Sequence, residues 1–352
     1  MTKGELLTLS QYLHNYQGRK LRLMEVCGTH TAALHSTGIR SILSDKIELV
    51  SGPGCPVCVT PSSYIDKLAE YAFGEHCRVL TFGDMLRVPG GRMSLATAKA
   101  NGGQVDFFYN PEDVLTLARQ EPDTLFVLGA VGFETTIPVW GNVVRRAAEE
   151  KIENVKLLTA LKTMPQAMAM LCEKGNIDGF LCPGHVAVVT GCGDFRHLSE
   201  KYHKPMAVGG FDREHLLCGV GRLVWAAAQN REGFWNEYRE VVREEGNPLA
   251  QQLADGVFVT GDAVWRGFGK IESSGRYLRP EYAGFDAGSW GLEEDNLPPG
   301  CCCDRVLLGE LHPWQCPCFG RVCRPEHPVG ACMVSAEGSC AISFLNGGQH
   351  EN

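Results

Sequence analysis

Short apolar runs alternate with stretches of helical periodicity through the first two thirds of the chain. After Pro61, apolar residues recur at the i, i+3, i+4 and i+7 spacing of one helix face, and Thr60 is the expected N-cap. This alternation predicts parallel sheets with helices on both faces, in which ligands gather at the carboxyl ends of strands. The runs with the composition of buried strands are 20–26, 47–52, 77–83, 103–109, 124–132, 155–161, 179–184 and 205–210.

Two segments of the chain resemble each other. LVSGPGCPVCVT (49–60) and GFLCPGHVAVVT (179–190) share an apolar run, a Pro-Gly step and a valine-rich continuation. Duplication and chance are both open explanations for so short a match. Duplication would give two similar α/β domains, each with a parallel sheet, facing a cleft that is lined by loops from both.

From about residue 231 the pattern changes. Residues 263–278 alternate as an antiparallel strand does, and Pro, Gly and Cys dominate the sequence that follows. A unit so rich in loops buries little core alone and needs a metal to stabilise it. We therefore expect a first α/β domain over 20–130 with Cys27 and the CPVC loop, a second over 131–230, and a third, loop-rich domain over 231–352, to which residues 1–19 are an optional addition.

The composition of the 352 residues is that of an ordinary globular protein, with 44% hydrophobic and 21% charged residues. A net charge of −8 without basic clusters argues against nucleic acid as a partner. Neither a membrane span nor a signal peptide is expected, so we place the protein in the cytoplasm. In that reducing compartment, sixteen cysteines indicate metal ligands or redox thiols rather than a disulfide framework.

Eight of the cysteines fall within residues 301–340. Four thiolates around one centre hold either zinc or an iron–sulfur cluster. The wide spacing of Cys301, Cys316, Cys323 and Cys340 favours an iron–sulfur cluster wrapped by loops, and zinc remains the alternative.

Three further cysteines lie in loops near the start of the chain. Cys55 and Cys58 form a C-x-x-C between a strand and a helix N-terminus, which favours a lowered thiol pKa and either redox exchange or an open iron site. Cys27 ends a strand, and His30 is a candidate proton partner or second donor to its sulfur. A turn with a structural histidine is the alternative. Three thiols on adjacent strand ends could bind iron or zinc.

Polar residues follow several other strands and are candidates for lining the same cleft. For Asp84 and Glu134, a helix cap is the competing interpretation. The candidates are Asp84, Arg87, Glu134, Thr135, Thr136 and His185.

Six motifs, taken together and in this order, resemble the HypD family of hydrogenase maturation proteins nearly end to end: MEVCGTHT, ELVSGPGCPVCVTP, TFGDMLRVPG, AVGFETTIP, CPGHV and CPCFGRVCRPEHPVGACMVSAEGSC. The resemblance implies a cytoplasmic scaffold with redox capacity for the Fe(CN)2CO fragment of nickel–iron hydrogenases. It implies two similar α/β domains and a third domain with a [4Fe–4S] cluster. It also implies a protein that is monomeric outside its complexes, binds a small HypC-type chaperone and accepts cyanide from a HypE-type donor.

Carried over by position, the resemblance makes Cys27 the thiolate that holds iron, with Cys55 and Cys58 as further iron thiols or a redox pair. It makes Cys301, Cys316, Cys323 and Cys340 the cluster ligands, although the triplet 301–303 leaves the first ligand open and Cys332 competes for the last. The alternative function is a stand-alone thiol or iron–sulfur oxidoreductase acting on a small substrate. Turnover without a partner protein would distinguish that enzyme from an assembly scaffold.

Overall fold

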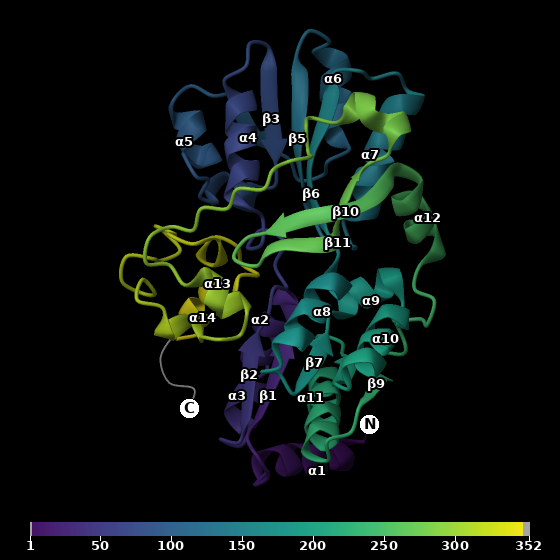
Figure 1. Ribbon diagram of the computed structural model, residues 1–352, viewed down its shortest axis with the longest axis vertical. Helices are drawn as coiled ribbons and strands as arrows, with labels where there is room; N and C mark the ends of the chain where they lie inside the picture. Colours follow the sequence, from purple (N-terminus) through teal and green to yellow (C-terminus); the bar gives the residue numbers. More distant parts are fainter. Residues whose placement is uncertain (1, 348–352) are drawn as a thin grey trace.

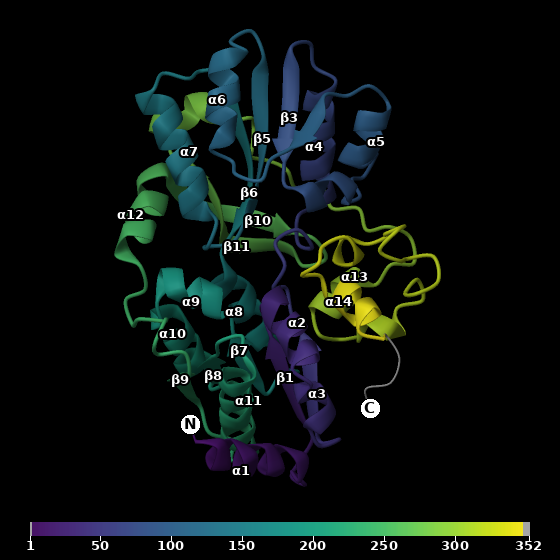
Figure 2. The same ribbon diagram turned by 180° about the vertical axis from the view of Figure 1, so that it is seen from behind.

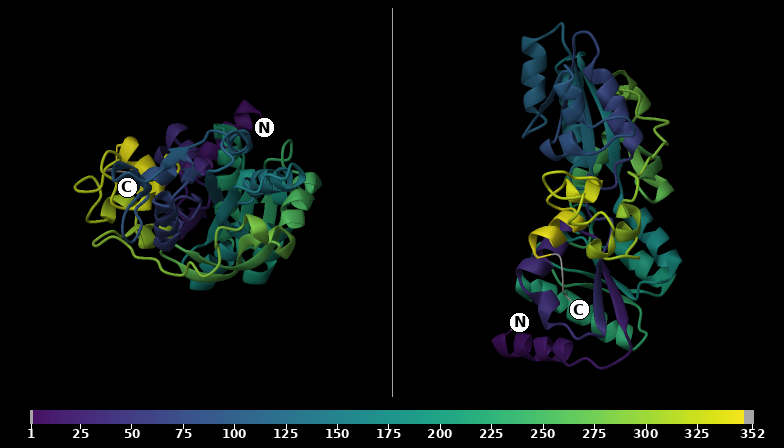
Figure 3. Two further views of the ribbon diagram at one scale, coloured as in Figure 1. Left: turned by 90° about the horizontal axis from the view of Figure 1, so that it is seen from above. Right: turned by 90° about the vertical axis from the view of Figure 1, so that its left-hand side faces the viewer.

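The computed structural model describes residues 2–347. Two β-sheets lie at opposite ends of the long axis of the molecule (Figures 1 and 2). Residues 286–347, called the C-terminal segment below, lie at the level where the two sheets meet and are drawn in yellow-green to yellow (Figure 3). The first sheet, the second sheet and the C-terminal segment therefore meet at this level of the molecule.

The first sheet contains five strands, all parallel. The chain runs from β1 outward to β2 on one side, and later resumes at β7 on the other side of β1. The carboxyl ends of β1 and β7 therefore flank a topological switch point, where doubly wound sheets bind ligands. In order, the strands are β2 (Ile47–Ser51), β1 (Leu21–Glu25), β7 (Gly179–Cys182), β8 (Pro205–Val208) and β9 (Gly233–Asn236).

The second sheet contains six strands, of which four are parallel and two form an antiparallel hairpin at one edge. Its parallel part repeats the order of the first sheet, because β4 lies on one side of β3 and β5 on the other. β3 and β5 therefore flank a second switch point. In order, the strands are β10 (Phe258–Trp265), β11 (Gly269–Leu278), β6 (Val155–Lys162), β5 (Leu125–Gly132), β3 (Cys77–Thr81) and β4 (Val105–Phe107).

Helices cover both faces of both sheets, which explains why the central strands are almost continuously apolar. The faces of the first sheet are covered by α2 (Gly28–Ser36), α3 (Ile39–Ile42) and α11 (Arg213–Ala228), and by α8 (Met164–Lys174) and α10 (Gly193–Tyr202). α1 (Lys3–His14) lies across the lower end of this unit (Figure 1) and packs against α11 and α3. The faces of the second sheet are covered by α4 (Ser62–Ala72) and α5 (Leu95–Ala100), and by α6 (Asp113–Gln120), α7 (Ile137–Glu149) and α12 (Pro248–Val257).

Short helices connect or continue these layers. α9 (Gly184–Thr190) follows β7, and the 3-10 helix η1 (Gly83–Arg87) follows β3. The remaining short elements are η2 (Pro280–Phe285), α13 (Cys303–Leu307), η3 (Pro313–Gln315), η4 (Ala331–Met333) and α14 (Ser339–Leu345). In the part of the chain that the structure describes, no helix combines the length and hydropathy needed to cross a membrane.

The C-terminal segment is tied to the start of α4. The Asp295 carboxylate accepts hydrogen bonds from the backbone N–H of Ser62 at 3.1 Å and of Gly267 at 2.9 Å. It also lies 3.7 Å from the buried guanidinium of Arg266, which donates to the carbonyl of Thr60 at 2.7 Å. The predicted Thr60 cap is therefore wrong, because a carboxylate distant in the sequence caps this helix instead.

All eight predicted strands are confirmed, with differences of a few residues at their ends. The expected boundaries at residues 130 and 231 do not coincide with the sheets, because each sheet takes strands from two separate parts of the chain. The predicted antiparallel region, 263–278, joins the second sheet through β11 and β6 rather than a third unit. Residues 3–14 form α1, which packs against α11 of the first sheet and not against the C-terminal segment.

The two similar sequence segments do not lie in two different sheets, as a duplication of domains would require. Residues 49–60 begin in β2 and residues 179–190 begin with β7, and both strands belong to the first sheet. The likeness between the two halves of the molecule lies instead in the strand order around β1 and around β3.

Candidate functional site

A cavity of about 500 Å³ opens at the junction of the two sheets. Its lining includes residues from the carboxyl ends of all four strands that flank the two switch points. Cys27 follows β1, His185 follows β7, Asp84 follows β3 and Thr135 follows β5. The expectation that strand ends from two α/β units share one cleft is thus confirmed, and the cavity stands where such folds bind ligands.

Cys27 is the single cysteine among the described residues that line this cavity. It stands at the N-cap position of α2 and is 7% exposed, so it lies in the cavity wall and not on an open loop. Burial raises the pKa of its thiol to about 11, and the Glu337 carboxylate also raises it, whereas the backbone N–H groups of His30 and Thr29 oppose the rise. The thiol is therefore protonated at neutral pH.

Two glycines allow other segments to approach Cys27 closely. A Cβ on Gly54 would lie 2.4 Å from the backbone N and Cα of Cys27, and a Cβ on Gly28 would lie 2.4 Å from the carbonyl oxygen of Glu337. The N–H of Gly28 donates to the carbonyl of Gly54 at 3.2 Å. The loop before the C-x-x-C and the C-terminal segment therefore pack directly on the backbone around Cys27, which requires glycine at both positions.

The side chain of His30 does not contact the sulfur of Cys27. Its Nε2 donates to the carbonyl of Gly209 at 3.1 Å, and its buried Nδ1 has no hydrogen-bond partner within residues 2–347. Its ring packs against Phe211 in a tilted arrangement, with 4.6 Å between centroids and an interplanar angle of 31°. Burial lowers the pKa of His30 to about 4, so the ring is neutral. The proposed role as proton partner of Cys27 finds no support in this geometry.

Of the six polar residues expected in the cleft, two serve other parts of the fold. Glu134 accepts a hydrogen bond from the backbone N–H of Met164 at 2.7 Å, so it caps α8, and burial raises its pKa to about 7. Arg87 donates to the carbonyls of Pro325 at 2.8 Å and Val334 at 3.4 Å, so it anchors the C-terminal segment. The four that line the cavity are Asp84, Thr135, Thr136 and His185.

Sequence reasoning missed the contribution of the C-terminal segment to this cavity. Glu337 lines the cavity and accepts a hydrogen bond from the Thr29 hydroxyl at 3.1 Å. Burial raises the pKa of this carboxyl group. The sequence offered only a weak signal, an acidic residue beside Gly338 in a loop distant from every strand.

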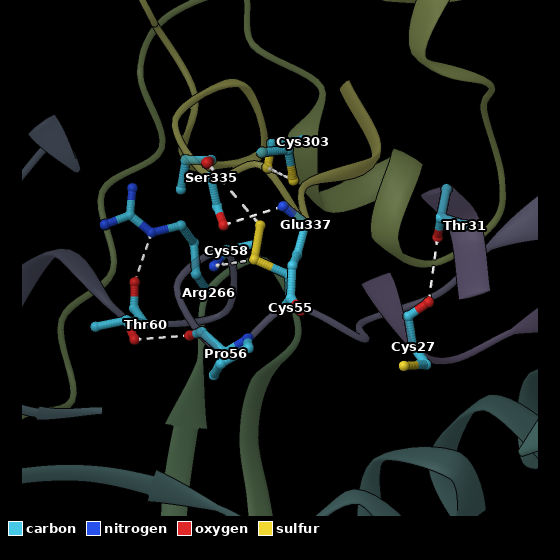
Figure 4. The surroundings of a disulfide bond; sticks show 12 residues. Cys27, Thr31, Cys55, Pro56, Cys58, Thr60, Arg266, Cys303, Ser335 and Glu337 are labelled. Carbon is cyan, nitrogen blue, oxygen red and sulfur yellow. Dashed lines mark hydrogen bonds between the residues drawn. A yellow bond between two sulfur atoms is a disulfide. The ribbon is translucent and has the colours of Figure 1, made fainter. Parts of the chain in front are cut away.

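Cys55 and Cys58 form a disulfide, and both are buried. Neither lines the cavity, although their neighbours Gly54, Pro56 and Val57 do. The sulfur of Cys58 lies 3.9 Å from the carbonyl oxygen of Ala331 in the C-terminal segment. Figure 4 shows the disulfide with Cys27 to its right and Cys303 above it. In this oxidised form, the two sulfurs are bonded to each other and are not available as iron ligands.

The cysteines of the C-terminal segment gather into one group. The sulfurs of Cys303 and Cys332 lie 2.7 Å apart, and Cys332 also interacts with Cys340. Contacts from the Cys301 and Cys332 thiols lower the pKa of Cys303, with a further contribution from the charge of Arg266.

All candidate cluster ligands belong to this group. The thiols of Cys316 and Cys340 both raise the pKa of Cys323, and Cys301 contacts Cys303. An all-thiol donor set suits an iron–sulfur cluster or zinc. As the side chains stand, no three or more His, Cys, Asp or Glu residues of the described chain converge in a metal-binding arrangement. The residue types present thus fit an iron–sulfur cluster or zinc by their donor chemistry.

Comparison with known proteins identifies the family. The family model described as "HypD: Hydrogenase formation hypA family" matches residues 6–347. The chain belongs to the HypD family. It is 41% identical over 332 residues to the hydrogenase maturation factor HypD of Escherichia coli K12, covering 93% of this chain and 89% of that protein. The inference from the six motifs is thereby confirmed.

Two other members of the HypD family extend the comparison. A putative hydrogenase expression/formation protein of Methanocaldococcus jannaschii is 39% identical over 329 residues, with 92% of each chain covered. The hydrogenase maturation factor HypD of Rhodobacter capsulatus is 35% identical over 357 residues, with 98% of this chain and 94% of the relative covered. The similarity thus extends over both sheets and the C-terminal segment.

Proposed function

We propose that this chain acts in hydrogenase maturation as the scaffold on which the Fe(CN)2CO fragment of nickel–iron hydrogenases is assembled. The observation that supports this most strongly is the Cys27 cavity, where one thiol faces polar residues from the switch points of two sheets. A soft thiolate suits low-spin iron. The family assignment and the names of the relatives support the same process.

Cys27 holds the iron in this proposal. Because burial raises the pKa of its thiol to about 11, the thiol stays protonated until a metal ion arrives and displaces the proton. A protonated thiol is a poor nucleophile, so the empty scaffold resists alkylation and oxidation. The cavity then accepts the iron without exposing the sulfur on the surface.

Cys55 and Cys58 act as a redox pair rather than as iron thiols. Their disulfide and their position outside the cavity lining support this choice. Opening the disulfide takes up two electrons and two protons. The contact of Cys58 with Ala331, next to Cys332, brings the pair beside the cysteines of the C-terminal segment.

Cys301, Cys316, Cys323 and Cys340 hold a [4Fe–4S] cluster, which supplies single electrons when bound. The contact between Cys303 and Cys332 supports this choice of ligands, because it pairs those two thiols with each other. Cys303 also contacts Cys301, and Cys332 also contacts Cys340, so the pair adjoins two of the candidate ligands.

The partners follow from the same proposal. A small HypC-type chaperone shares the iron, and a HypE-type protein delivers cyanide, both in the cytoplasm. The opening of the cavity between the two sheets supports docking of such partners, because the strand-end loops that carry the site surround its mouth.

Infrared spectroscopy of the protein purified with its small chaperone tests the proposal. We expect bands of iron-bound cyanide and carbon monoxide, together with about four further iron atoms and acid-labile sulfide from the cluster. A protein with zinc at the C-terminal cysteines and no diatomic bands would contradict both parts of the proposal. Turnover of a small substrate by the isolated protein would favour the oxidoreductase alternative.

A further inference from the structure

The lining of the Cys27 cavity contains both apolar and polar side chains. His185 is one of the polar residues, and its side chain is exposed. Within residues 2–347, neither of its ring nitrogens has a hydrogen-bond partner, so one donor and one acceptor are available to a ligand. The apolar residues of the lining include Val26, Val57, Val131, Met164 and Val186.

An aromatic stack fixes the place of His185. Its ring stacks on Phe211 with 4.0 Å between centroids and an interplanar angle of 27°. His30, from the helix that begins beside Cys27, packs against the same phenyl ring in a tilted arrangement, with 4.6 Å between centroids. Phe211 thus contacts both imidazoles, one at the cavity wall and one in the core.

The loop that carries Phe211 is itself held between these two histidines. The Nε2 of His30 donates to the carbonyl of Gly209 at 3.1 Å. A Cβ on Gly184 would lie 2.6 Å from the same carbonyl oxygen, so only glycine allows the backbone before His185 to approach the loop. The position of His185 is therefore set through His30 by the same helix that begins at the iron-holding cysteine.

The polar and the apolar residues of this lining match the two kinds of diatomic ligand. Cyanide bound to iron carries negative charge and keeps a lone pair on its outer nitrogen, which accepts hydrogen bonds well. Carbon monoxide bound to iron is a poor acceptor, and an apolar wall accommodates it without leaving a polar group unpaired. Burial lowers the pKa of His185, so its imidazole is neutral at pH 7 and donates one N–H without adding a charge.

On the basis of the proposed function, we propose that His185, positioned by Phe211 and His30, donates a hydrogen bond to the nitrogen of one cyanide on the iron that Cys27 holds. The carbon monoxide then faces the valine-lined wall. His185 is a ligand-binding residue in this account, and Phe211 and His30 are positioning residues. The role of His30, three residues after Cys27, is therefore to orient an imidazole from the neighbouring strand end and not to exchange protons with the sulfur.

The test is the infrared spectrum of the protein in complex with its small chaperone. His185→Phe keeps a ring to stack on Phe211 but removes the N–H, so we expect one of the two cyanide bands to move to lower wavenumber while iron content stays the same. His185→Gln retains an N–H donor, so its cyanide band should lie close to the position in the unchanged protein. His197→Phe is the matched control, because His197 is exposed on α10, away from the cavity lining, and its spectrum should equal that of the unchanged protein.

Phe211→Leu tests the positioning role. Without the stack, the imidazole should adopt several orientations, and the same cyanide band should broaden or split. Unchanged cyanide bands in His185→Phe would overturn the inference, and a Phe211→Leu band as sharp as the original would overturn the positioning role. Absence of diatomic bands from the unchanged protein would instead overturn the proposed function on which the inference rests.

Discussion

The two cysteine regions of this protein place their thiols in opposite ways. Cys27 follows a buried strand of a parallel sheet and begins a helix, so regular structure fixes it without any metal. The cysteines of residues 301–340 lie in loops and in helices of seven residues or fewer. Regular structure therefore preforms the first region. Under the proposed function, the first region receives the iron as cargo, and the loops of the second region depend on the proposed cluster for their shape.

The largest effect is expected from removing a thiol of the second region. Cys323→Ala and Cys340→Ala should lose iron and sulfide and become sensitive to protease beyond about residue 290. The free energy that a structural metal supplies to such a loop-rich region is on the order of 10 kcal/mol. Metal analysis and limited proteolysis measure the effect, with Cys77→Ala on β3 as the control. Variants that keep full iron and resist protease would show that the second region does not depend on these thiols for its structure.

The next largest effect is expected from acid, which should lower the free energy of unfolding because His30 is buried in its neutral form. Its pKa is about 4 in the fold against 6.5 in the unfolded chain, so the unfolded state binds more protons between these values. Stability is therefore complete above pH 6.5 and falls as the pH drops towards 4, by on the order of 3 kcal/mol.

Denaturant unfolding between pH 7 and pH 4.5 checks this dependence. His30→Phe should have a flatter profile than the unchanged protein, while the exposed control His197→Phe should keep the original slope. Equal slopes in all three proteins would show that His30 is not buried in its neutral form.

Close packing of backbone around Cys27 predicts a smaller loss. In Gly54→Ala, the new Cβ meets the backbone of Cys27 at 2.4 Å, which no side-chain rotation can relieve, so we expect a loss of about 1–3 kcal/mol. Gly256→Ala is the control, because a Cβ there has nothing within 4 Å and Gly256 lies within α12. Thermal unfolding measures both, and similar stability for the two variants would contradict the close approach.

The smallest effect is expected in the alkylation rates of Cys27 and of the neighbouring Cys55 and Cys58. Cys27 should be alkylated slowly near pH 8, with a rate that rises with pH towards its pKa of about 11. Glu337→Gln removes a nearby negative charge, so it should lower that pKa and increase the rate a few-fold at pH 8. Cys55 and Cys58 should react only after reduction of their disulfide. Mass spectrometry of labelled peptides distinguishes the sites, and an unchanged rate in Glu337→Gln would exclude the electrostatic effect.

The sequence predicted strands and strand-end residues well, because strands buried on both faces show apolar runs and because ligand sites follow such strands. Asp84, Thr135, Thr136 and His185 were found in this way. The division of the strands between the sheets was not predictable, because no local pattern tells which sheet the next strand will join. β9 was missed because its four residues are only half-buried and form no apolar run.

The contributions of distant loops were also beyond sequence reasoning. Asp295 caps α4, and Glu337 reaches Cys27, from a segment without periodicity. His30 was selected as a proton partner of Cys27, but spacing alone could not show that its ring packs against Phe211 instead. The pairing of Cys55 with Cys58 was one of two open alternatives, and only three-dimensional geometry placed their sulfurs outside the cavity.

The most direct test of the central claim compares Cys27→Ser with Cys55→Ser in complex with the small chaperone. Cys27→Ser should fold with a loss of about 1 kcal/mol or less and keep its iron–sulfur cluster, because regular structure fixes residue 27 and the cluster thiols lie elsewhere. Its cyanide and carbon monoxide infrared bands should be absent, because a serine hydroxyl ionises too poorly to replace a thiolate on low-spin iron. Undiminished bands in Cys27→Ser, with loss of the bands in Cys55→Ser, would contradict the account and make the C-x-x-C loop the iron site.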